Sequence, residues 1–490
     1  MHDVVILGGG PGGYATAFRA AARGLDVALV EADLVGGTCL HRGCIPSKAI
    51  LYVAEMLEEV HRSEVFGLKL TYDGLDGEGL DSFRSGVITR LHKGLDFLVG
   101  KRTTFHAGRG RLVRGDDGGL GVEVTADDGS TTHVAGRHVV LATGSVARSL
   151  PGVEVDGEVV QTSDQALWFT TPPRRAVIVG AGAIGMEFAS MWRPFGGEVT
   201  VVEALDRVLP LEDADCSQAV ADAYRRRGIE VLTGASVAAI RVEEREASED
   251  DDGEAAGGRV GVVDVEVEGE TRSLVADLVL VATGRGPNTA DVGAAELGIL
   301  DERGFAMTDE YGATEVPGLW AVGDVRPTLA LAHAAFAEGI VVADRIAEVD
   351  HVAPVDHVQT PRVTYCNPEV ASVGLTEAQA RERFGDEGVA VTRSSFRANA
   401  KGILAGSDGF VKVIHATGDV PVGAHGTTGP VLGVHIVGPH ATDLIGEATL
   451  ATAWEALPDE LAAITHAHPT LYEAMGEAFQ SAAGLPMHGH

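Results

Sequence analysis

Two segments far apart in the chain share one order of apolar and polar positions. In the first segment, an apolar run at residues 4–7 leads into a glycine turn at residues 8–13, and an alanine-rich helical stretch continues to about Arg23. A second apolar run at residues 26–30 then ends at Glu31. Short apolar runs bounded by turns are typical of buried strands, so this order predicts a βαβ unit with a glycine-rich first turn.

The same order recurs from residue 176 onwards. An apolar run at residues 176–179 precedes a glycine turn at residues 180–185, a helical stretch reaches Trp192, and a strand at residues 198–202 ends at Glu203. We interpret the recurrence as an internal repeat of a βαβ unit rather than a short-period solenoid. A chain with two such units is expected to have two nucleotide sites.

The pattern around the repeats predicts how the chain passes between domains. Residues 48–62 are expected to form a long helix, followed by a variable, β-rich segment to about residue 140. Two runs, at residues 141–144 and 281–284, end in Ala-Thr-Gly and are expected to cross between domains. From about Pro361, β-rich runs followed by helices predict a separate α+β domain.

Two segments have compositions that are unsuited to a core. Residues 243–258 are acidic and rich in glycine, so we expect a solvated surface loop. Residues 418–429 are rich in glycine and are expected to form a loop or a hairpin connection. Neither segment is assigned a function.

Composition and charge narrow the class of protein. The 490 residues predict roughly three domains at about 150 residues each. The net charge of −33 would repel a phosphate backbone or an anionic lipid surface, so neither a nucleic acid nor a membrane partner is expected. Four cysteines are too few for a disulfide-dense secreted protein, and the opening MHDVVILGGG resembles a strand entering a turn rather than a secretory signal. We therefore expect a cytoplasmic protein.

The first glycine turn has the pattern of a dinucleotide site. Gly8, Gly10 and Gly13 are spaced Gly-x-Gly-x-x-Gly between a strand and a helix. Glycines let the backbone approach a pyrophosphate, and the helix N-terminus offers free N–H groups and a positive dipole. Glu31 follows at the position where a carboxylate accepts hydrogen bonds from a ribose.

The second glycine turn repeats this pattern with Gly180, Gly182 and Gly185. Glu203 is its acidic residue, and a carboxylate there repels a 2′-phosphate, which favours NAD over NADP. Arg207 follows closely, so NADP is disfavoured rather than excluded.

Cys39 and Cys44 indicate thiol chemistry. Two residues five apart on a regular helix point about 140° away from each other, so a disulfide between them needs a distorted turn, for which Gly43 and Pro46 are suited. Such a disulfide would be exchangeable rather than structural. A zinc site that includes His41 lacks a fourth ligand nearby, and two unrelated buried thiols are the other alternative.

These motifs resemble those of the class I flavin-linked pyridine nucleotide–disulfide oxidoreductases over essentially the whole chain. The segment GGTCLHRGCIPSK, close after the first glycine turn, is the most informative. Further segments resemble the domain-crossing motif, the second FAD motif, the stretch that follows it along the flavin, the start of the interface domain and the acid/base motif. They are ATGRGPN at 282–288, TEVPGLWAVGD at 314–324, ALAH at 330–333, CNPEVASVG at 366–374 and HAHPTLYE at 466–473.

The resemblance implies an α/β fold with two Rossmann-like nucleotide-binding domains and a C-terminal α+β interface domain for dimerisation. The FAD-binding domain would be split by insertion of the NAD-binding domain. The implied boundaries are residues 1–148 and 277–348 for the two parts of the FAD-binding domain, 149–276 for the NAD-binding domain and 349–490 for the interface domain.

The resemblance also implies the site residues. Cys39 and Cys44 would form the redox disulfide, His468 would be the acid/base, and Glu473 would orient it. Lys48 would lie beside the flavin and pair with Glu187. Besides the glycines and acids of the two turns, the implied FAD and NAD contacts are Lys48, Gly110, Thr143, Gly144, Ser145, Glu187, Gly284, Asp324, Ala330, Leu331, Ala332 and His333.

Within the family, the chain is most similar to the enzymes that oxidise protein-bound dihydrolipoamide to lipoamide and pass electrons through the disulfide and FAD to NAD. There the disulfide and the histidine come from different subunits, which implies an obligate homodimer. The implied partners are lipoyl domains and the acyltransferase core of 2-oxo acid dehydrogenase complexes, with the glycine-cleavage lipoyl protein as a further candidate.

Other functions compete with this interpretation. The closest is an NAD(P)H-dependent reductase of a low-molecular-weight disulfide of the glutathione or mycothiol type. A quinone reductase would not need Cys39 and Cys44, a mercuric reductase would need a C-terminal cysteine pair, and a non-enzymatic redox sensor would not need His468 and Glu473.

Two features depart from the family pattern or fall outside it. His41 and Arg42 stand between the cysteines in place of the commoner Asn-Val; they either lower a thiol pKa or point outward, and we expect the second. Cys216 and Cys366 have no partner in the sequence and are expected to be ordinary buried thiols.

Overall fold

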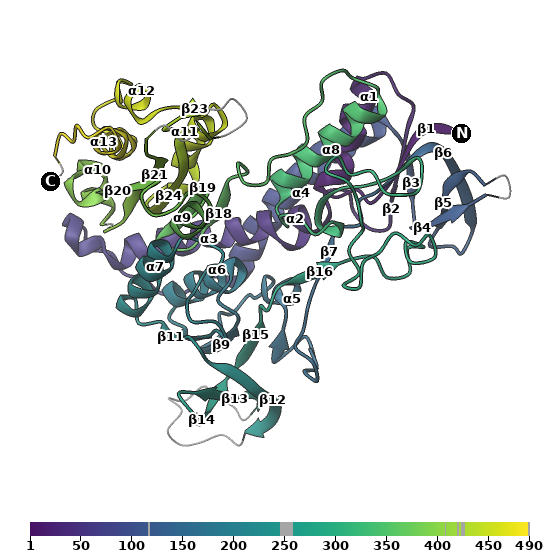
Figure 1. Ribbon diagram of the computed structural model, residues 1–490. Helices are drawn as coiled ribbons and strands as arrows, with labels where there is room; N and C mark the ends of the chain where they lie inside the picture. Colours follow the sequence, from purple (N-terminus) through teal and green to yellow (C-terminus); the bar gives the residue numbers. More distant parts are fainter. Residues whose placement is uncertain (116–117, 246–257, 407, 419–420, 423–426, 489–490) are drawn as a thin grey trace.

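The chain folds into three units, each built around its own sheet (Figure 1). The structure is a computed structural model, and it describes all residues except 116–117, 246–257, 407, 419–420, 423–426 and 489–490. No helix in the described part of the chain is long and apolar enough to cross a membrane.

The first unit is a sheet with strand order β3-β2-β1-β6-β5-β4, and β17 also pairs with β6. The predicted βαβ unit is present as β1, α1 and β2. In β1, Val5 and Leu7 face one apolar cluster while Val4 and Ile6 face another, which explains its unbroken apolar run. The elements are β1 (His2–Leu7), α1 (Pro11–Ala22), β2 (Val27–Glu31), α2 (Gly37–Arg42), α3 (Cys44–His61), α4 (Gly77–Arg102), β3 (Thr104–Ala107), β4 (Arg109–Arg114), β5 (Leu120–Thr125), β6 (Thr131–Leu141), β17 (Leu319–Ala321) and α8 (Ala332–Ile346).

The helix α4 corrects the expectation of a β-rich segment after α3. Its 26 residues bury only Leu80, Arg84, Ile88 and Val99. A helix so exposed lacks the regular apolar stripe by which helices are recognised in a sequence. The β-rich part of the segment begins only at β3.

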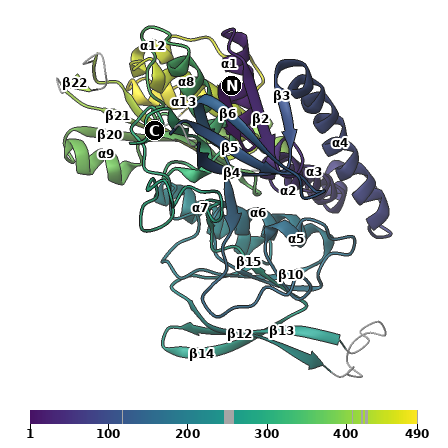
Figure 2. The same ribbon diagram turned by 90° about the vertical axis from the view of Figure 1, so that its right-hand side faces the viewer.

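The second unit contains the repeated βαβ element and lies below the other two in Figure 1. Its parallel sheet has the order β11-β10-β9-β15-β8, and a three-stranded antiparallel sheet, β12-β13-β14, projects beyond it (Figure 2). The elements are β8 (Val160–Gln161), α5 (Ser163–Ala166), β9 (Arg175–Val179), α6 (Ala183–Trp192), β10 (Glu198–Val202), α7 (Ala214–Arg226), β11 (Glu230–Leu232), β12 (Ser236–Arg245), β13 (Gly258–Val267), β14 (Glu270–Ala276) and β15 (Leu278–Val281).

The chain passes between the first two units through two short strands that pair with each other. β7 (Ser145–Ala147) and β16 (Arg285–Pro287) form a two-stranded antiparallel sheet directly after the two Ala-Thr-Gly segments. Because β15 pairs with β9, the second unit includes residues beyond 276, and we propose that its boundary lies after Val281 rather than at 276.

The third unit is the expected α+β domain. Its antiparallel sheet has the order β18-β19-β24-β21-β20, and α11 and α13 pack on it. Its elements are β18 (Arg362–Thr364), β19 (Glu369–Gly374), α9 (Glu377–Phe384), β20 (Val389–Ser395), α10 (Ala400–Ala405), β21 (Phe410–Ala416), β24 (Val431–Gly438), α11 (Ala441–Ala453), α12 (Pro458–Ala462) and α13 (Glu473–Ala482).

The two segments that we expected to be loops are described in part. Residues 243–245 continue β12 and Gly258 begins β13, whereas residues 246–257 lie outside the described residues. In the glycine-rich segment, β22 (Pro421–Val422) pairs with β23 (Thr427–Thr428), so the hairpin connection is confirmed. Residues 419–420 and 423–426 lie outside the described residues.

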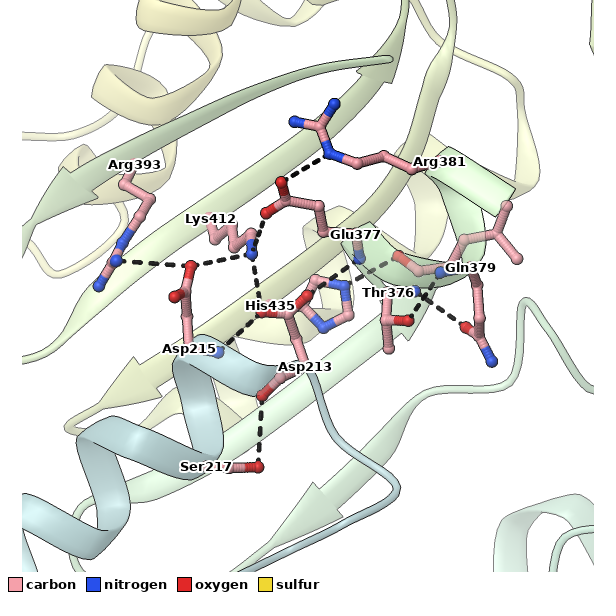
Figure 3. Close-up of polar contacts among 11 residues, drawn as sticks. Asp213, Asp215, Ser217, Thr376, Glu377, Gln379, Arg381, Arg393, Lys412 and His435 are labelled. Carbon is pink, nitrogen blue, oxygen red and sulfur yellow. Dashed lines mark hydrogen bonds and ion pairs between the residues drawn. The ribbon is translucent and has the colours of Figure 1, made fainter. Parts of the chain in front are cut away.

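A buried ionic cluster fastens the second unit to the third (Figure 3). Lys412 of β21, 2% exposed, donates through Nζ to Asp213 Oδ1 at 2.7 Å and to Asp215 Oδ2 at 2.9 Å, both at the start of α7. Its third partner is Glu377 of α9, at 2.7 Å. Burial acts to lower the pKa of Lys412, but the three carboxylates outweigh it and raise the pKa above its ordinary value.

Candidate active site

The first glycine turn lies between β1 and α1. Packing against the rest of the protein requires glycine at two of its three positions but not at the third. A Cβ on Gly8 would lie 2.3 Å from the Ala142 carbonyl oxygen, and one on Gly13 would lie 1.8 Å from that of Gly8. The protein's own packing therefore requires these two glycines. A Cβ on Gly10 would meet nothing closer than the Cα of Gly37, at 4.0 Å.

The second turn, between β9 and α6, repeats this division. A Cβ on Gly180 would lie 2.5 Å from the Ala282 carbonyl oxygen, and one on Gly185 would lie 1.9 Å from the Gly180 carbonyl oxygen. At Gly182, no atom of the described residues lies within 4 Å of the Cβ position. The middle glycine of each turn therefore borders open space at a helix N-terminus. A pyrophosphate fits such a place, because it needs close approach to backbone N–H groups.

The acid at the end of the second strand holds each turn in shape. Glu31 Oε2 accepts a hydrogen bond of 2.6 Å from the Gly9 amide, and Glu203 Oε2 accepts one of 2.7 Å from the Ala181 amide. The exposed side chain of Arg207 donates to the Pro210 carbonyl at 3.0 Å. Contacts of Glu31 and Glu203 with a ribose remain predictions.

The two cysteines lie on either side of the expected break in the helix. α2 ends at Arg42, Gly43 has φ −148° and ψ −109°, and α3 begins at Cys44. Both cysteines are free thiols in this structure, and their side chains are hydrogen-bonded to each other. The distorted turn is therefore confirmed, and it brings the two sulfur atoms together.

The environment makes the two thiols unequal. The hydrogen bond with Cys39, assisted by the positive charge of Lys48, lowers the pKa of Cys44 to about 7 against the opposing effect of burial. The same hydrogen bond and burial raise the pKa of Cys39. Cys44 is therefore the thiol that ionises first.

Lys48 pairs with Glu187, as the family resemblance implied. Its Nζ lies 2.9 Å and 2.8 Å from the two carboxylate oxygens of Glu187 and 4.5 Å from the ring centroid of Tyr365. Burial opposes the charge on Lys48, but Glu187 outweighs it and the pKa of Lys48 is raised. This pair ties α3 of the first unit to α6 of the second.

Asp324 lies beside the crossing between the units. Its Oδ2 accepts a hydrogen bond of 2.6 Å from Ser145 Oγ, and burial raises its pKa. Thr143 Oγ1 donates to the Asn288 carbonyl at 2.6 Å. Gly144 and Gly284, with φ of 74° and 112°, have no protein atom within 4 Å of their Cβ positions.

The remaining predicted cofactor contacts divide into two groups. Ala330, Leu331, Ala332 and His333 lie at the start of α8, where His333 Nε2 is 2.7 Å from the Pro361 carbonyl oxygen. Gly110 lies in β4, and a Cβ there would lie 2.4 Å from Leu7 Cδ1. Core packing accounts for Gly110, and its cofactor contact stays a prediction.

Glu338 of α8 was not predicted from the sequence. Although this side chain is 1% exposed, its Oε2 accepts a 2.6 Å hydrogen bond from the amide of Gly323, the residue before Asp324. Its Oε1 accepts from Thr328 Oγ1 at 2.9 Å. The only signal in the sequence was an acid on the apolar face of a helix.

Of the two residues between the cysteines, Arg42 points outward as expected, whereas His41 does not: it is half-buried and its ring packs against that of His92. Arg42 is exposed and donates to Asp33 Oδ2 at 3.0 Å, and His41 Nε2 lies 2.9 Å from the Val35 carbonyl oxygen. Cys216 and Cys366 are buried free thiols. Among the described residues, no group of three or more His, Cys, Asp or Glu is arranged to hold a metal ion.

His468 and Glu473 form the predicted pair at the start of α13. His468 Nδ1 lies 2.7 Å from Glu473 Oε1, and the Thr470 amide donates to Glu473 Oε2 at 2.9 Å. The histidine is 79% exposed. The hydrogen bond with His468 lowers the pKa of Glu473.

One chain does not bring this pair to the cysteines. Figures 1 and 2 show α13 in the third unit, apart from α2 and the start of α3 in the first. No hydrogen bond or ion pair recorded among the described residues joins His468 to Cys39 or Cys44.

Comparison with known proteins covers the whole of this arrangement. Residues 2–339 match the model of the family described as pyridine nucleotide-disulphide oxidoreductase, and residues 360–479 match that family's dimerisation domain. The dihydrolipoyl dehydrogenases of Bacillus subtilis and Corynebacterium glutamicum are each 38% identical, over 99% of this chain and 99% and 98% of their own. The crystal structure of LpdA from Mycobacterium tuberculosis superimposes with a TM-score of 0.84 at 25% identity, covering 98% of this chain and 99% of that one.

Proposed function

Because the chain belongs to the pyridine nucleotide-disulphide oxidoreductase family, we propose from that premise the reaction that it catalyses. The protein is a dihydrolipoyl dehydrogenase: it oxidises dihydrolipoamide to lipoamide and reduces NAD to NADH. The observation that carries this function is the full-length similarity to dihydrolipoyl dehydrogenases. The thiol pair at the break before α3 and the His468–Glu473 pair support it with the required chemistry.

The enzyme uses FAD and NAD, and the two glycine turns fit them. The open side of Gly10 would face the FAD pyrophosphate and that of Gly182 the NAD pyrophosphate. Asp324 would hold the ribityl chain of FAD, and Lys48 would lie beside the flavin ring. When bound, FAD supplies the acceptor for the electron pair of the dithiol, and NAD carries that pair away as a hydride.

The first chemical step is thiol–disulfide exchange in the oxidised enzyme. His468 removes the proton from one thiol of dihydrolipoamide, and the resulting thiolate bonds to Cys39 Sγ. The Cys39–Cys44 bond breaks, and Cys44 leaves as a thiolate. In this step Cys39 has no proton to donate, so the charge of Lys48 is what lowers the pKa of Cys44 and favours this direction, because the thiol of lower pKa is the better leaving group.

The second step closes the product. The other sulfur of the substrate loses its proton and attacks the sulfur bonded to Cys39, so that lipoamide forms and Cys39 leaves as a thiolate. His468 returns its proton to Cys39, and the second proton goes to solvent. The protein then holds Cys39 as a thiol and Cys44 as a thiolate, with the electron pair that leaves through the cofactors.

A complete site would need two subunits. We propose a homodimer in which His468 of one subunit serves Cys39 of the other, supported by the family's dimerisation domain and by the separation of these residues in one chain. The physiological substrates would be lipoyl domains of 2-oxo acid dehydrogenase complexes or of the glycine-cleavage system, in the cytoplasm.

Subunit complementation tests both the reaction and the shared site. Cys44→Ser and His468→Ala are each expected to reduce NAD-linked oxidation of dihydrolipoamide severely as homodimers. In a heterodimer of the two, the cysteines of one subunit and the histidine of the other form one intact site, so about half of the wild-type rate should return. An inactive heterodimer would place the histidine in the same chain as its cysteines. Wild-type enzyme that binds FAD but does not oxidise dihydrolipoamide would refute the reaction itself.

A further inference from the structure

Arg285 begins a chain of contacts that ends at Asp324. Its Nε donates to Ser145 Oγ at 2.7 Å, and its Nη2 donates to the Ser145 carbonyl oxygen at 2.7 Å. Ser145 Oγ in turn donates to Asp324 Oδ2 at 2.6 Å. Arg285 therefore donates hydrogen bonds to both the backbone and the side chain of Ser145, the residue that contacts Asp324.

This geometry fixes the direction of the Ser145 hydroxyl. A hydroxyl group has one proton and two lone pairs, whereas a guanidinium group can only donate. Because Arg285 occupies a lone pair of Ser145 Oγ, the single proton of that hydroxyl is directed to Asp324. Without Arg285, the hydroxyl could rotate and accept from another donor instead.

The charge of Arg285 acts in the same sense. Asp324 is half-buried, and this partial burial together with the negative charge of Glu338 disfavours its ionised form. The Ser145 hydrogen bond and the charge of Arg285 favour that form. An ionised carboxylate offers lone pairs only, so the oxygen of Asp324 that Ser145 does not use can accept from a ligand hydroxyl.

The surroundings of Arg285 restrict the movement of its side chain. It lies on β16, which pairs with β7 of the crossing between the first two units, and its side chain is 16% exposed. Its Nη1 faces Asp164 Oδ1 of α5 at 3.8 Å. The side chain is thus enclosed by residues of both nucleotide-binding units.

We propose that Arg285 is a positioning residue for FAD: acting through the Ser145 hydroxyl, it holds Asp324 as an acceptor for the ribityl chain. This inference rests on the proposed function, in which Asp324 binds FAD. Arg285 acts mainly through Ser145, so the larger part of its contribution to FAD affinity needs that hydroxyl, while its charge favours the ionised form of Asp324 in either case.

A double-mutant cycle on FAD release tests the inference. Holoenzymes are diluted, and the fluorescence of released FAD gives its Kd for wild type, Arg285→Met, Ser145→Ala and the double variant. Each single variant should bind FAD about tenfold or more weakly, since each loses a hydrogen bond to a charged group. In the double variant, the loss of FAD affinity should be clearly smaller than the product of the two single losses. The exposed Arg148 of the same crossing provides the control, and Arg148→Met should keep the wild-type Kd.

Each result decides between the possibilities. Multiplied effects in the double variant, or an unchanged Kd in Arg285→Met, would overturn the inference. If Arg285→Met does not fold, Arg285→Lys replaces it in the same cycle. This variant keeps the positive charge and one donor nitrogen, so it should keep part of the wild-type affinity for FAD. A wild-type protein without bound FAD would instead refute the proposed function.

Discussion

Glu473 accepts a hydrogen bond from Nδ1 of His468 across 2.7 Å. The lowered pKa of Glu473 keeps this carboxylate ionised at neutral pH, and an ionised carboxylate can only accept. The proton of the neutral imidazole is therefore on Nδ1, and the lone pair is on Nε2. The exposed face of His468 thus presents a base to an incoming thiol.

Replacing Glu473 by glutamine should reverse this tautomer. In Glu473→Gln, the side-chain amide can donate to Nδ1, which leaves the proton on Nε2 and removes the base. We expect the rate constant kcat for dihydrolipoamide oxidation to fall by roughly 10²–10⁴, with FAD content unchanged. Steady-state kinetics would measure it. The matched control is Glu477→Gln on the same helix, whose partner is His488; a loss as large in this variant would exclude the tautomer explanation.

Gly182→Ala should separate binding from folding. The backbone at Gly182, φ −72° and ψ −178°, suits alanine, and its Cβ would meet no protein atom within 4 Å. We expect the free energy of unfolding to change by no more than about 1 kcal/mol, while the KM for NAD rises because the added methyl occupies the pyrophosphate's place. Urea unfolding and NAD kinetics would be measured together.

Two companion variants sharpen this prediction. Gly185→Ala should damage folding, since its Cβ would lie 1.9 Å from the Gly180 carbonyl oxygen. Gly10→Ala should weaken FAD binding and leave the KM for NAD unchanged. An unaltered KM for NAD in Gly182→Ala would show that this open side does not face the nucleotide.

The reduced enzyme should contain one thiol that titrates near neutrality. With a pKa of about 7, Cys44 is a thiolate above this pH and a thiol below it. Lys48→Met removes the positive charge, so the pKa of Cys44 should rise toward its ordinary value of about 8.5. The pH dependence of the alkylation rate measures this. The exposed Lys101 supplies the control variant Lys101→Met, and identical titrations in both variants would contradict the role of Lys48.

Lys412→Met should destabilise the junction between the second and third units. It leaves the buried Asp213 without its cation, whereas Glu377 keeps its ion pair with Arg381, and breaking a buried ion pair costs about 3–5 kcal/mol in the free energy of unfolding at pH 7. Urea unfolding would measure this loss. The exposed Lys401 of α10 gives the matched variant Lys401→Met, which should stay near wild type.

The loss in Lys412→Met should depend on pH in a definite direction. Lys412 lowers the folded-state pKa of Asp213 and Glu377. Their contribution is therefore full above their unfolded values near about 4 and disappears as the pH falls through the folded values. The difference between wild type and variant should shrink as the pH is lowered below about 4. A difference that stays constant with pH would show that the cluster is not the cause.

The sequence predicted the features that are formed by residues close together along the chain. Both βαβ units were predictable because Val4 to Leu7 and Ala176 to Val179 are buried on both faces and lead into turns whose first and third positions require glycine. The thiol pair was predictable because Gly43 and Pro46 allow the distorted turn that two cysteines five residues apart need, and the His468–Glu473 pair was implied by the resemblance of residues 466–473 to the family's acid/base motif. α4 was not, because an exposed helix carries little apolar periodicity.

Residues that act over long separations left almost no signal. Arg285 meets Ser145 from 140 positions away, and Lys412 meets Asp213 from 199. A charged side chain in a strand or loop is normally solvated, so only the folded arrangement reveals that these two are enclosed. Glu338 lies between these extremes: it is 15 positions from Gly323, whose amide it accepts from, and it lies within α8.

The glycine turns also bear on how such a protein can change over generations. In each turn, the chain's own backbone excludes any other residue at the first and third glycines, but no contact among the described residues excludes one at the second. Folding alone therefore does not require glycine at position 10 or position 182. Only selection for cofactor binding would keep glycine there. A lineage that stopped using NAD would be free to lose Gly182 while it kept Gly180 and Gly185. The three glycines of one motif are thus kept by two separate requirements, folding at the first and third positions and cofactor binding at the second.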